Sequence, residues 1–163
     1  MKKLSLSLFS ALILFLFFNP LSFAETKWIE GQAIVIDGDT IKVQGKKIRL
    51  FGIDAPELKQ ICKRKNGEPW KCGLSAKMHL EHLIYNNQNG HVACEYEYLD
   101  RYGRILSECM GLSGVMVFTG SAIAYTRYTT KLILDVQEMA KKEKKGLWSG
   151  TFDYPEDWRR KNK

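Results

Sequence analysis

Residues 34–57 read IVIDGDTIKVQGKKIRLFGIDAPE, and this stretch decides the fold because short strand-like runs alternate in it with turn sequences. Asp37-Gly38 and Gln44-Gly45-Lys46 favour turns. Thr40–Gln44 alternates apolar and polar side chains, which is the period of a half-buried strand. We therefore predict three consecutive strands, Trp28–Ile36, Thr40–Gln44 and Lys47–Ile53, with Pro56 ending the third.

The remainder of the chain predicts helices around a second pair of strands. A helix is expected at Leu74–Asn89, because apolar or small residues recur on one helical face: Ala76, Leu80, Leu83, Ile84 and Asn87. Strands follow at 91–98 and 104–110. A short helix is expected at Ser113–Thr119, capped by Ser113, and an amphipathic one at Leu132–Lys145 that buries Leu132, Val136, Met139 and Ala140. His79 and His82 are interpreted as part of a solvated helix face rather than as metal ligands.

Five short strands with a helix between the third and fourth give the element order of an OB-type β-barrel. The predicted fold class is therefore α+β, a five-stranded OB-type barrel (β-β-β-α-β-β) with two to three helices. OB barrels commonly bind oligonucleotides or oligosaccharides, but a fold does not fix a function.

The N-terminus has the pattern of a secretory signal peptide. Lys2 and Lys3 precede a largely apolar run of 15 residues, Leu4–Phe18. The small residues Ser22 and Ala24 occupy the two positions that signal peptidase recognises before the cleavage site. We predict residues 1–24 as the signal peptide, cleaved after Ala24, and 25–163 as one domain ending in a basic tail at about 150–163. The alternative is a membrane anchor, but a spanning helix needs about 20 apolar residues. The expected location is the periplasm or the cell exterior.

The charge points to a polyanionic partner. The 163-residue chain has a formal net charge of +7. Residues 1–24 contribute two lysines and no acids, so most of the positive charge lies in the predicted mature domain. A basic exported domain suits nucleic acid or an anionic surface. The basic tail, with Trp158, Arg159 and Arg160, could pack back on the domain or bind a surface, and its sequence does not decide between them.

Four cysteines in an exported chain predict two disulfides. The sequence DRYGR (100–104) is a turn between the last two predicted strands, and a hairpin folded about it places Cys94 opposite Cys109. That leaves Cys62 with Cys72, closing the loop CKRKNGEPWKC. The alternative is a four-cysteine metal site, although the chain lacks the close CxxC spacing of such sites.

The acids of the opening stretch suggest a cation site. If strands two and three form a hairpin about Gly45–Lys46, Asp39 and Asp54 lie at the same end of the ribbon. Converging carboxylates repel each other unless a cation joins them, and carboxylate, carbonyl and water oxygens suit Ca²⁺. Glu57 could hold a water molecule. The alternative for each acid alone is an ordinary turn or strand exit.

Two arginines complete the pattern that phosphoryl transfer requires. Arg49 points to the opposite strand face from Ile48 and Leu50, and Arg104 opens the last strand. A planar, permanently charged guanidinium matches phosphate oxygens and stabilises charge that develops in the transition state. The alternative for Arg49 is an ordinary solvent-facing strand residue.

The chain resembles the staphylococcal nuclease (thermonuclease) family across Trp28–Gly150, and in particular an exported bacterial subgroup with disulfides. The matching motifs are IDGDT (36–40), IRLFGIDAPE (48–57), DRYGR (100–104), AYTRY (124–128) and AKKEKKGLWS (140–149). The resemblance implies an OB barrel and a Ca²⁺-dependent phosphodiesterase that cleaves DNA and RNA to 3′-phosphate products. We expect a monomer that prefers single-stranded DNA or RNA, with no stable membrane anchor after cleavage of the signal peptide.

The resemblance assigns roles by motif. Metal ligands would be Asp39, Asp54 and the backbone carbonyl of Ala55, where the founding member has threonine. Catalytic residues would be Arg49, Glu57 and Arg104, and substrate-binding residues Arg101, Tyr102, Tyr125 and Tyr128. The competing hypothesis is a catalytically weak OB module that binds nucleic acid or other polyanions.

Overall fold

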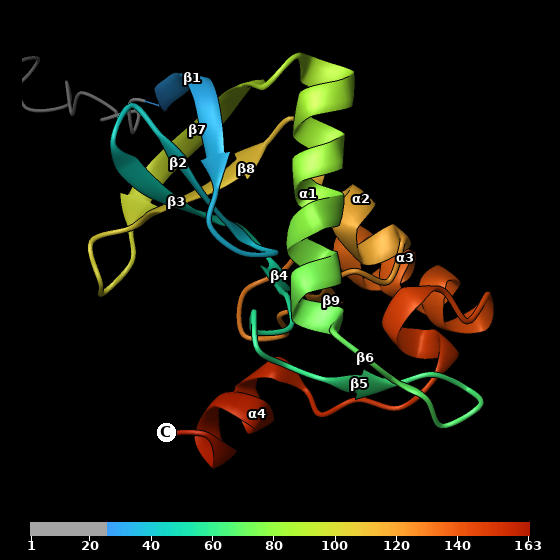
Figure 1. The fold of residues 1–163 in the computed structure, drawn as a ribbon. Helices are drawn as coiled ribbons and strands as arrows, with labels where there is room; N and C mark the ends of the chain where they lie inside the picture. Colours follow the sequence, from blue (N-terminus) through green and yellow to red (C-terminus); the bar gives the residue numbers. More distant parts are fainter. Residues whose placement is uncertain (1–25) are drawn as a thin grey trace, which may run out of the picture.

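Five strands close into a barrel in the computed structural model, which describes residues 26–163 (Figure 1). The predicted signal peptide, residues 1–24, lies outside the described residues. The barrel order is β1-β2-β3-β8-β7, formed by β1 (Lys27–Val35), β2 (Thr40–Val43), β3 (Lys46–Leu50), β7 (His91–Leu99) and β8 (Ile105–Cys109). Neighbours are antiparallel except the parallel pair β3–β8. This mixed barrel, with helix α1 between β3 and β7, confirms the predicted α+β fold of OB type.

The strand pattern sets the barrel interior. Ile41, Val43 and Ile48 are fully buried, while the intervening Lys42 is exposed, as a period of two requires. Helix α1 (Cys72–Gln88) packs against the barrel with Leu80 and Ile84 fully buried. Its apolar face is therefore the predicted one among the side chains that the structure describes.

The register between β2 and β3 differs from the prediction. Thr40 pairs with Arg49 and Val43 with Lys46, so the turn lies about one residue earlier than expected. Strand β3 ends at Leu50, and Gly52 adopts φ +78, a left-handed conformation that favours glycine. The chain then forms a separate strand, β4 (Ile53–Asp54), which pairs with β9 (Ile123–Ala124). The single strand predicted at Lys47–Ile53 was wrong because this glycine redirects the chain.

The hairpin β7–β8 confirms the predicted cysteine register. Cys94 pairs with Cys109, and a β-bulge between Tyr96 and Tyr98 absorbs a shift closer to the turn. Two disulfides, Cys62–Cys72 and Cys94–Cys109, join the four cysteines, so the alternative of a four-cysteine metal site is wrong. The first disulfide ties β5 (Cys62–Lys63) to the start of α1, beside β6 (Pro69–Trp70).

Two details of the C-terminal helices were predicted wrongly. Helix α2 (Leu112–Phe118) begins after Gly111, and the buried Ser113 hydroxyl makes no cap hydrogen bond. Helix α3 (Lys131–Lys142) buries Ile133, Gln137 and Ala140, whereas Leu132 and Met139 are 71% and 49% exposed. The buried face is rotated because Gln137 Oε1 accepts the Ala124 N–H at 2.8 Å, which satisfies a polar side chain in the core.

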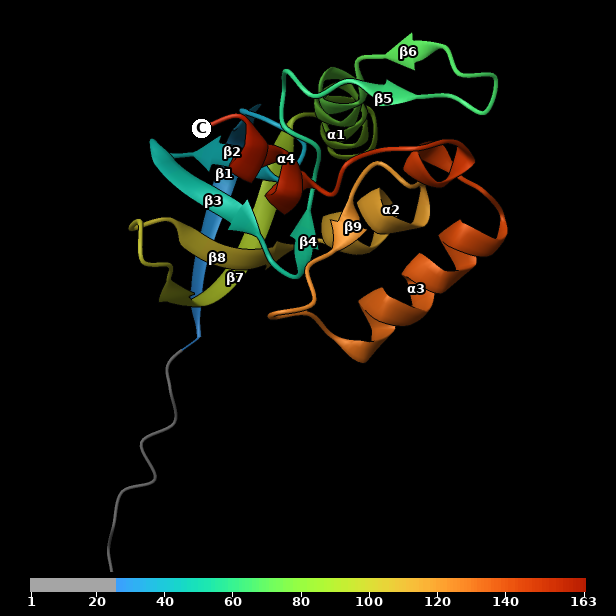
Figure 2. The same ribbon diagram turned by 90° about the horizontal axis from the view of Figure 1, so that it is seen from below.

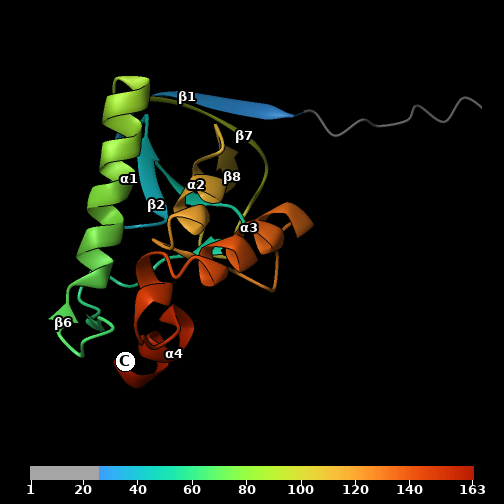
Figure 3. The same ribbon diagram turned by 90° about the vertical axis from the view of Figure 1, so that its right-hand side faces the viewer.

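A short helix near the C-terminus lies close to the end of β4. After the 3₁₀ turn η1 (Gly146–Ser149), residues Pro155–Lys161 form α4, which lies across one end of the barrel near β4 (Figure 2). The side view places α4 below the first turn of α1 (Figure 3). The tail therefore packs back on the domain, which resolves the choice that its sequence left open. Among the helices of residues 26–163, none is long and apolar enough to cross a membrane.

Candidate active site

Arg49 joins the two predicted cation ligands. Its Nη1 donates to Asp39 Oδ1, and its Nη2 donates to Asp54 Oδ1 at 2.8 Å and to the Ile53 carbonyl at 3.1 Å. Arg49, Asp39 and Asp54 are only 8%, 3% and 1% exposed. Arg49 is therefore not an ordinary solvent-facing strand residue. The predicted register between strands two and three, from which the two acids were placed at one end of the ribbon, was wrong. Asp39 and Asp54 are instead joined through the Arg49 guanidinium.

Backbone turns hold Asp39 in place. The Asp39 N–H donates to Asp37 Oδ1 at 3.1 Å, and the Leu50 N–H donates to the Asp39 carbonyl at 2.8 Å. The second carboxylate oxygen of Asp39 accepts the Ala55 N–H at 2.7 Å. The IDGDT turn and the residue after β4 are thus connected through one buried carboxylate.

The electrostatics of this group follow from its burial. Burial raises the pKa of the Asp39 carboxyl, against the lowering effect of Arg49. For Arg49, burial acts to lower the pKa, but Asp39 and Asp54 outweigh it, so its pKa is raised and the guanidinium stays charged. Two buried carboxylates and one buried arginine leave the cluster with a net negative charge, which favours a further cation.

A cavity of about 660 Å³ opens above this cluster. It brings together nine of the ten residues predicted for the site, and Asp54 lies buried beneath it. The predicted residues that line it are Asp39, Arg49, Ala55, Glu57, Arg101, Tyr102, Arg104, Tyr125 and Tyr128. The cavity is also lined by residues that the sequence analysis had not selected, namely Asp37, Thr40, Pro56, Asp100, Arg127 and Arg159.

Asp100 positions Arg104. Its Oδ2 accepts from Arg104 Nε at 2.7 Å, while its Oδ1 accepts the N–H groups of Tyr102 and Arg104, each at 2.9 Å. Burial alone would raise the pKa of Asp100, but these hydrogen bonds outweigh it and lower the pKa. The guanidinium carbons of Arg101 and Arg104 also lie 4.8 and 5.6 Å from the Tyr102 ring centre. The DRYGR turn thus holds two cations at the cavity wall.

Aromatic rings form another wall. Tyr125 and Tyr128 meet edge to face, with ring centres 4.7 Å apart, and Tyr128 also packs against Phe51 at 5.7 Å. The Tyr125 N–H donates to the Gly52 carbonyl at 2.8 Å, so the β4–β9 region fixes this wall. Aromatic faces beside a basic wall are suited to stacking bases of a single strand.

Glu57 lies where two backbone segments cross. A Cβ on Gly73 would lie 1.7 Å from the Glu57 carbonyl oxygen, so only glycine fits at this point of α1. The Glu57 N–H donates to Gln60 Oε1 at 3.2 Å, and Gln60 in turn donates to the Asp153 carbonyl at 2.7 Å. The first turn of α1 and the tail therefore both support the segment that carries Glu57.

Arg159 of α4, one of the lining residues that the sequence analysis had not selected, contacts two of the predicted acids directly. Its Nη1 donates to Asp54 Oδ1 at 3.0 Å and to Glu57 Oε1 at 2.8 Å, and its Nη2 donates to Asp54 Oδ2 at 2.9 Å. Burial acts to lower the pKa of Arg159, but its hydrogen bonds to Asp54 and Glu57 outweigh this effect, so its pKa is raised. The basic tail is the only signal of this contact in the sequence, and no local pattern connects that tail to the acids.

The oxygen donors fit a hard cation in their chemistry. Within residues 26–163, no group of three or more His, Cys, Asp or Glu side chains converges as a metal centre. The predicted ligand set needs only two carboxylates and a backbone carbonyl, and both carboxylates already bind cations in the form of guanidinium groups. Asp39, Asp54 and Ala55 are the described residues that could hold Ca²⁺ here.

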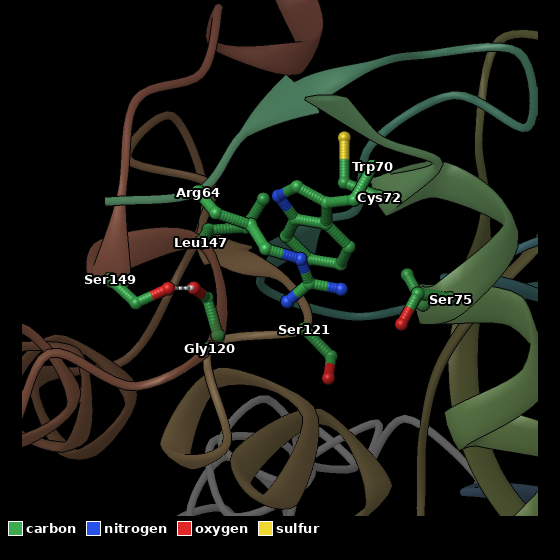
Figure 4. A pocket seen from close by; sticks show the side chains of 10 residues that line it. Arg64, Trp70, Cys72, Ser75, Gly120, Ser121, Leu147 and Ser149 are labelled. Carbon is green, nitrogen blue, oxygen red and sulfur yellow. Dashed lines mark hydrogen bonds between the residues drawn. The ribbon is translucent and has the colours of Figure 1, made fainter. Parts of the chain in front are cut away.

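A second cavity, of about 280 Å³, lies away from the acids. Arg64 reaches over the Trp70 ring at 5.2 Å, and Ser75 and Ser121 lie near its guanidinium (Figure 4). Carboxylates are missing from its lining as the structure describes it. Its described lining therefore offers no carboxylate as a base or cation ligand for phosphoryl transfer.

Sequence comparison now places the chain in a family. Residues 47–150 match the family described as "Staphylococcal nuclease homologue", which covers more than half of the chain. The chain therefore belongs to the staphylococcal nuclease family, and this confirms the resemblance inferred from its motifs.

Individual relatives match a larger share of the chain. An "Uncharacterized endonuclease" of Escherichia coli is 36% identical over 155 residues, covering 88% of this chain and 91% of the relative. A protein of the same name from Escherichia coli O157:H7 is 35% identical with the same coverage. The "Succinoglycan biosynthesis protein ExoI" of Rhizobium meliloti (strain 1021) is 32% identical over 125 residues. That alignment covers 74% of this chain but 64% of ExoI, so the chain spans less than two thirds of that relative.

Proposed function

We propose that this protein is an exported, Ca²⁺-dependent endonuclease that hydrolyses DNA and RNA to 3′-phosphate products without selecting the sugar. The observation that carries the proposal is the buried Arg49 held between Asp39 and Asp54, beneath a cavity that Glu57 and Arg104 also line. Family membership and the names of the Escherichia coli relatives support the same reaction class.

The cation site would be formed by Asp39, Asp54 and the Ala55 carbonyl. These are hard oxygen donors, the type that Ca²⁺ prefers over soft or nitrogen ligands. When bound, the cation would neutralise charge on the phosphate oxygens of the substrate. The net negative charge of the Arg49–Asp39–Asp54 cluster supports binding of a cation at this position.

The chain's own residues would perform the remaining steps. Glu57 orients a water molecule and accepts its proton as the water oxygen bonds to phosphorus. The bond between phosphorus and the 5′ oxygen breaks, and that oxygen takes a proton from solvent. Arg49 and Arg104 donate to the phosphate oxygens as negative charge builds on them. The result is a 3′-phosphate on one fragment and a 5′-hydroxyl on the other.

The rest of the cavity would bind substrate. Tyr125 and Tyr128 provide ring faces and edges for a base, while Arg101 and Tyr102 lie at the basic wall where a terminal phosphate would reach. Base stacking is tolerant of sequence because every base has a π-face. We therefore propose a monomeric enzyme that acts preferentially on single strands.

The two disulfides and the predicted signal peptide support export. Two disulfides persist in oxidising compartments and are rare in the cytosol. We propose that cleavage after Ala24 releases the domain to the periplasm or the cell exterior, without a membrane anchor.

The testing experiment is hydrolysis of single-stranded DNA and RNA by residues 25–163 with both disulfides intact, in Ca²⁺ and then in EGTA. The expected result is calcium-dependent cleavage that leaves 3′-phosphate ends. Asp39→Asn serves as a matched loss of one cation ligand with little change of shape. Nucleic-acid binding without turnover in Ca²⁺ would instead identify a polyanion-binding OB module and overturn the proposal.

A further inference from the structure

One guanidinium from the end of the chain binds the carboxylates that the proposed reaction needs free. Arg159 engages both oxygens of Asp54 and one oxygen of Glu57, with donor–acceptor distances of 2.8–3.0 Å. Asp54 is 1% exposed, so these are charge-assisted bonds to a buried carboxylate, which are stronger than surface ion pairs. Arg159 therefore occupies the position at which a divalent cation would contact Asp54 and Glu57.

Asp54 has little capacity left for another cation. Its Oδ1 accepts from Arg49 and Arg159, and its Oδ2 accepts from Arg159. A carboxylate offers about four lone-pair directions in total, and three are occupied. Two cations sharing one buried carboxylate would also repel each other strongly, because the local dielectric is low.

Arg159 is the group that can be released. Arg49 is fixed on the barrel strand β3 and is 8% exposed, whereas the Arg159 side chain is 36% exposed on a seven-residue helix. Within α4 only Pro155 is fully buried and Trp158 is partly buried, and the other ion pairs of its side chains, such as Arg127–Glu156, are exposed. A segment with little buried apolar surface opens at low cost in free energy.

We propose that Arg159 is an active-site residue that occupies Asp54 and Glu57 in place of a divalent cation, and that it thereby sets the calcium affinity of the site. This inference rests on the proposed function. Calcium binding displaces the guanidinium from Asp54, frees Glu57 for the water molecule, and loosens α4. Until calcium binds, Arg159 keeps Asp54 and Glu57 paired.

The first test is calcium binding by titration calorimetry without nucleic acid, for the wild-type chain and for Arg159→Gln. Removing the competitor should tighten calcium binding about tenfold, as expected for a charge-assisted bond that no longer has to be broken. Arg160→Gln is the matched control, because it removes the same charge from the same helix but pairs with Asp157 and is 73% exposed. Arg160→Gln should leave the calcium affinity unchanged. The two variants have the same net charge, and they differ only in whether the contact with Asp54 and Glu57 is removed.

The second test follows α4 itself by hydrogen exchange of residues 152–163 in the wild-type chain. Calcium should increase amide exchange in this segment, and in Arg159→Gln the segment should exchange rapidly with or without calcium. Circular dichroism checks that each variant is folded.

The outcomes separate this inference from the function. Equal or weaker calcium binding by Arg159→Gln overturns the inference, as does calcium-induced protection of the tail, while calcium-dependent cleavage by the wild type would leave the proposed function standing. Absence of calcium binding in both proteins overturns both. If Arg159→Gln binds calcium more tightly but the wild-type chain does not cleave nucleic acid in Ca²⁺, only the nuclease proposal is overturned.

Discussion

Arg159 and Asp54 are 105 residues apart in the chain, and the guanidinium of the first donates to both carboxylate oxygens of the second. Asp54 is also bound by Arg49, so one buried carboxylate is shared by a barrel strand and the C-terminal helix. Both guanidinium groups keep their charge because the acids raise the pKa of each. The structure thus connects its core, its candidate site and its tail at one side chain.

Arg49→Ala should impair both cleavage and folding. The change removes a donor from the phosphate and leaves Asp39 and Asp54 buried beside each other without their shared partner. We expect cleavage to fall by about 10³-fold or more and stability to fall by about 3–5 kcal/mol. Urea unfolding and kcat/KM on single-stranded DNA measure the two effects. Lys47→Ala, an exposed change on the same strand, is the control, and full activity of Arg49→Ala would refute the assigned role.

Asp100→Asn should misplace Arg104 without unfolding the hairpin. Asparagine keeps the shape and the Oδ1 acceptor, but it loses the charged bond to Arg104 Nε. We expect the cleavage rate to drop about tenfold, because a small displacement of a phosphate-binding group is costly. Steady-state kinetics test this beside Glu108→Gln, an exposed acid on β8. Equal rates for the two variants would show that Asp100 does not position Arg104.

His79 should make stability depend on pH. Burial lowers its pKa below the ordinary 6.5, with a smaller contribution from His82, and Nδ1 lies 2.7 Å from Ser121 Oγ. The unfolded chain therefore binds the proton first, so this contribution is complete above pH 6.5 and is lost as the pH falls below it. His79 was interpreted as part of a solvated helix face, and its partial burial corrects that interpretation.

Urea midpoints at pH 7.5 and 5.5 measure this dependence. The wild type should lose more stability between these values than His79→Gln does, while His91→Gln, a change at an exposed histidine, should behave like the wild type. An identical pH dependence in His79→Gln would contradict the assignment.

Removing the Cys62–Cys72 disulfide should destabilise the domain. The disulfide closes a loop with a sequence separation of 10, and the chain-entropy estimate for such a loop is about 2–3 kcal/mol. The double change Cys62→Ala/Cys72→Ala, compared with Ser75→Ala on the exposed side of α1, gives this cost by urea unfolding. Mass mapping of non-reduced peptides should show Cys62–Cys72 and Cys94–Cys109, and any other pairing would contradict the structure.

Ser113 and Ser107 form a matched pair with opposite expectations. The buried Ser113 hydroxyl has no hydrogen-bond partner among the described residues, whereas Ser107 Oγ donates to the Glu95 carbonyl at 2.5 Å. Ser113→Ala should therefore stabilise the domain by about 1 kcal/mol and Ser107→Ala should destabilise it by a similar amount. Thermal unfolding compares them, and destabilisation by Ser113→Ala would reveal a partner for that hydroxyl.

Much of the barrel could be predicted because its determinants are local. Alternation at Thr40–Val43, the Asp37-Gly38 turn and the DRYGR hairpin each fix a short stretch, and the Cys94–Cys109 register follows from the turn. The third strand was predicted too long because the left-handed Gly52 breaks it, and a glycine at this position reads equally well as part of the strand. The buried face of α3 was wrong because Gln137, a polar residue, is buried through a bond to another element.

The sequence by itself determined the OB order of elements, the disulfide pairs, the family, and most of the residues that line the candidate site. Each of these depends on neighbours in the chain or on short motifs. Only the tertiary structure decided that Arg49 is the buried link between Asp39 and Asp54, and that Arg159 lies on the same acids. The physical reason is that a buried carboxylate is stable only when a cation is paired with it. Chain folding places Arg159 of the tail beside β4, and no local sequence pattern at Arg159 or at Asp54 indicates this pairing.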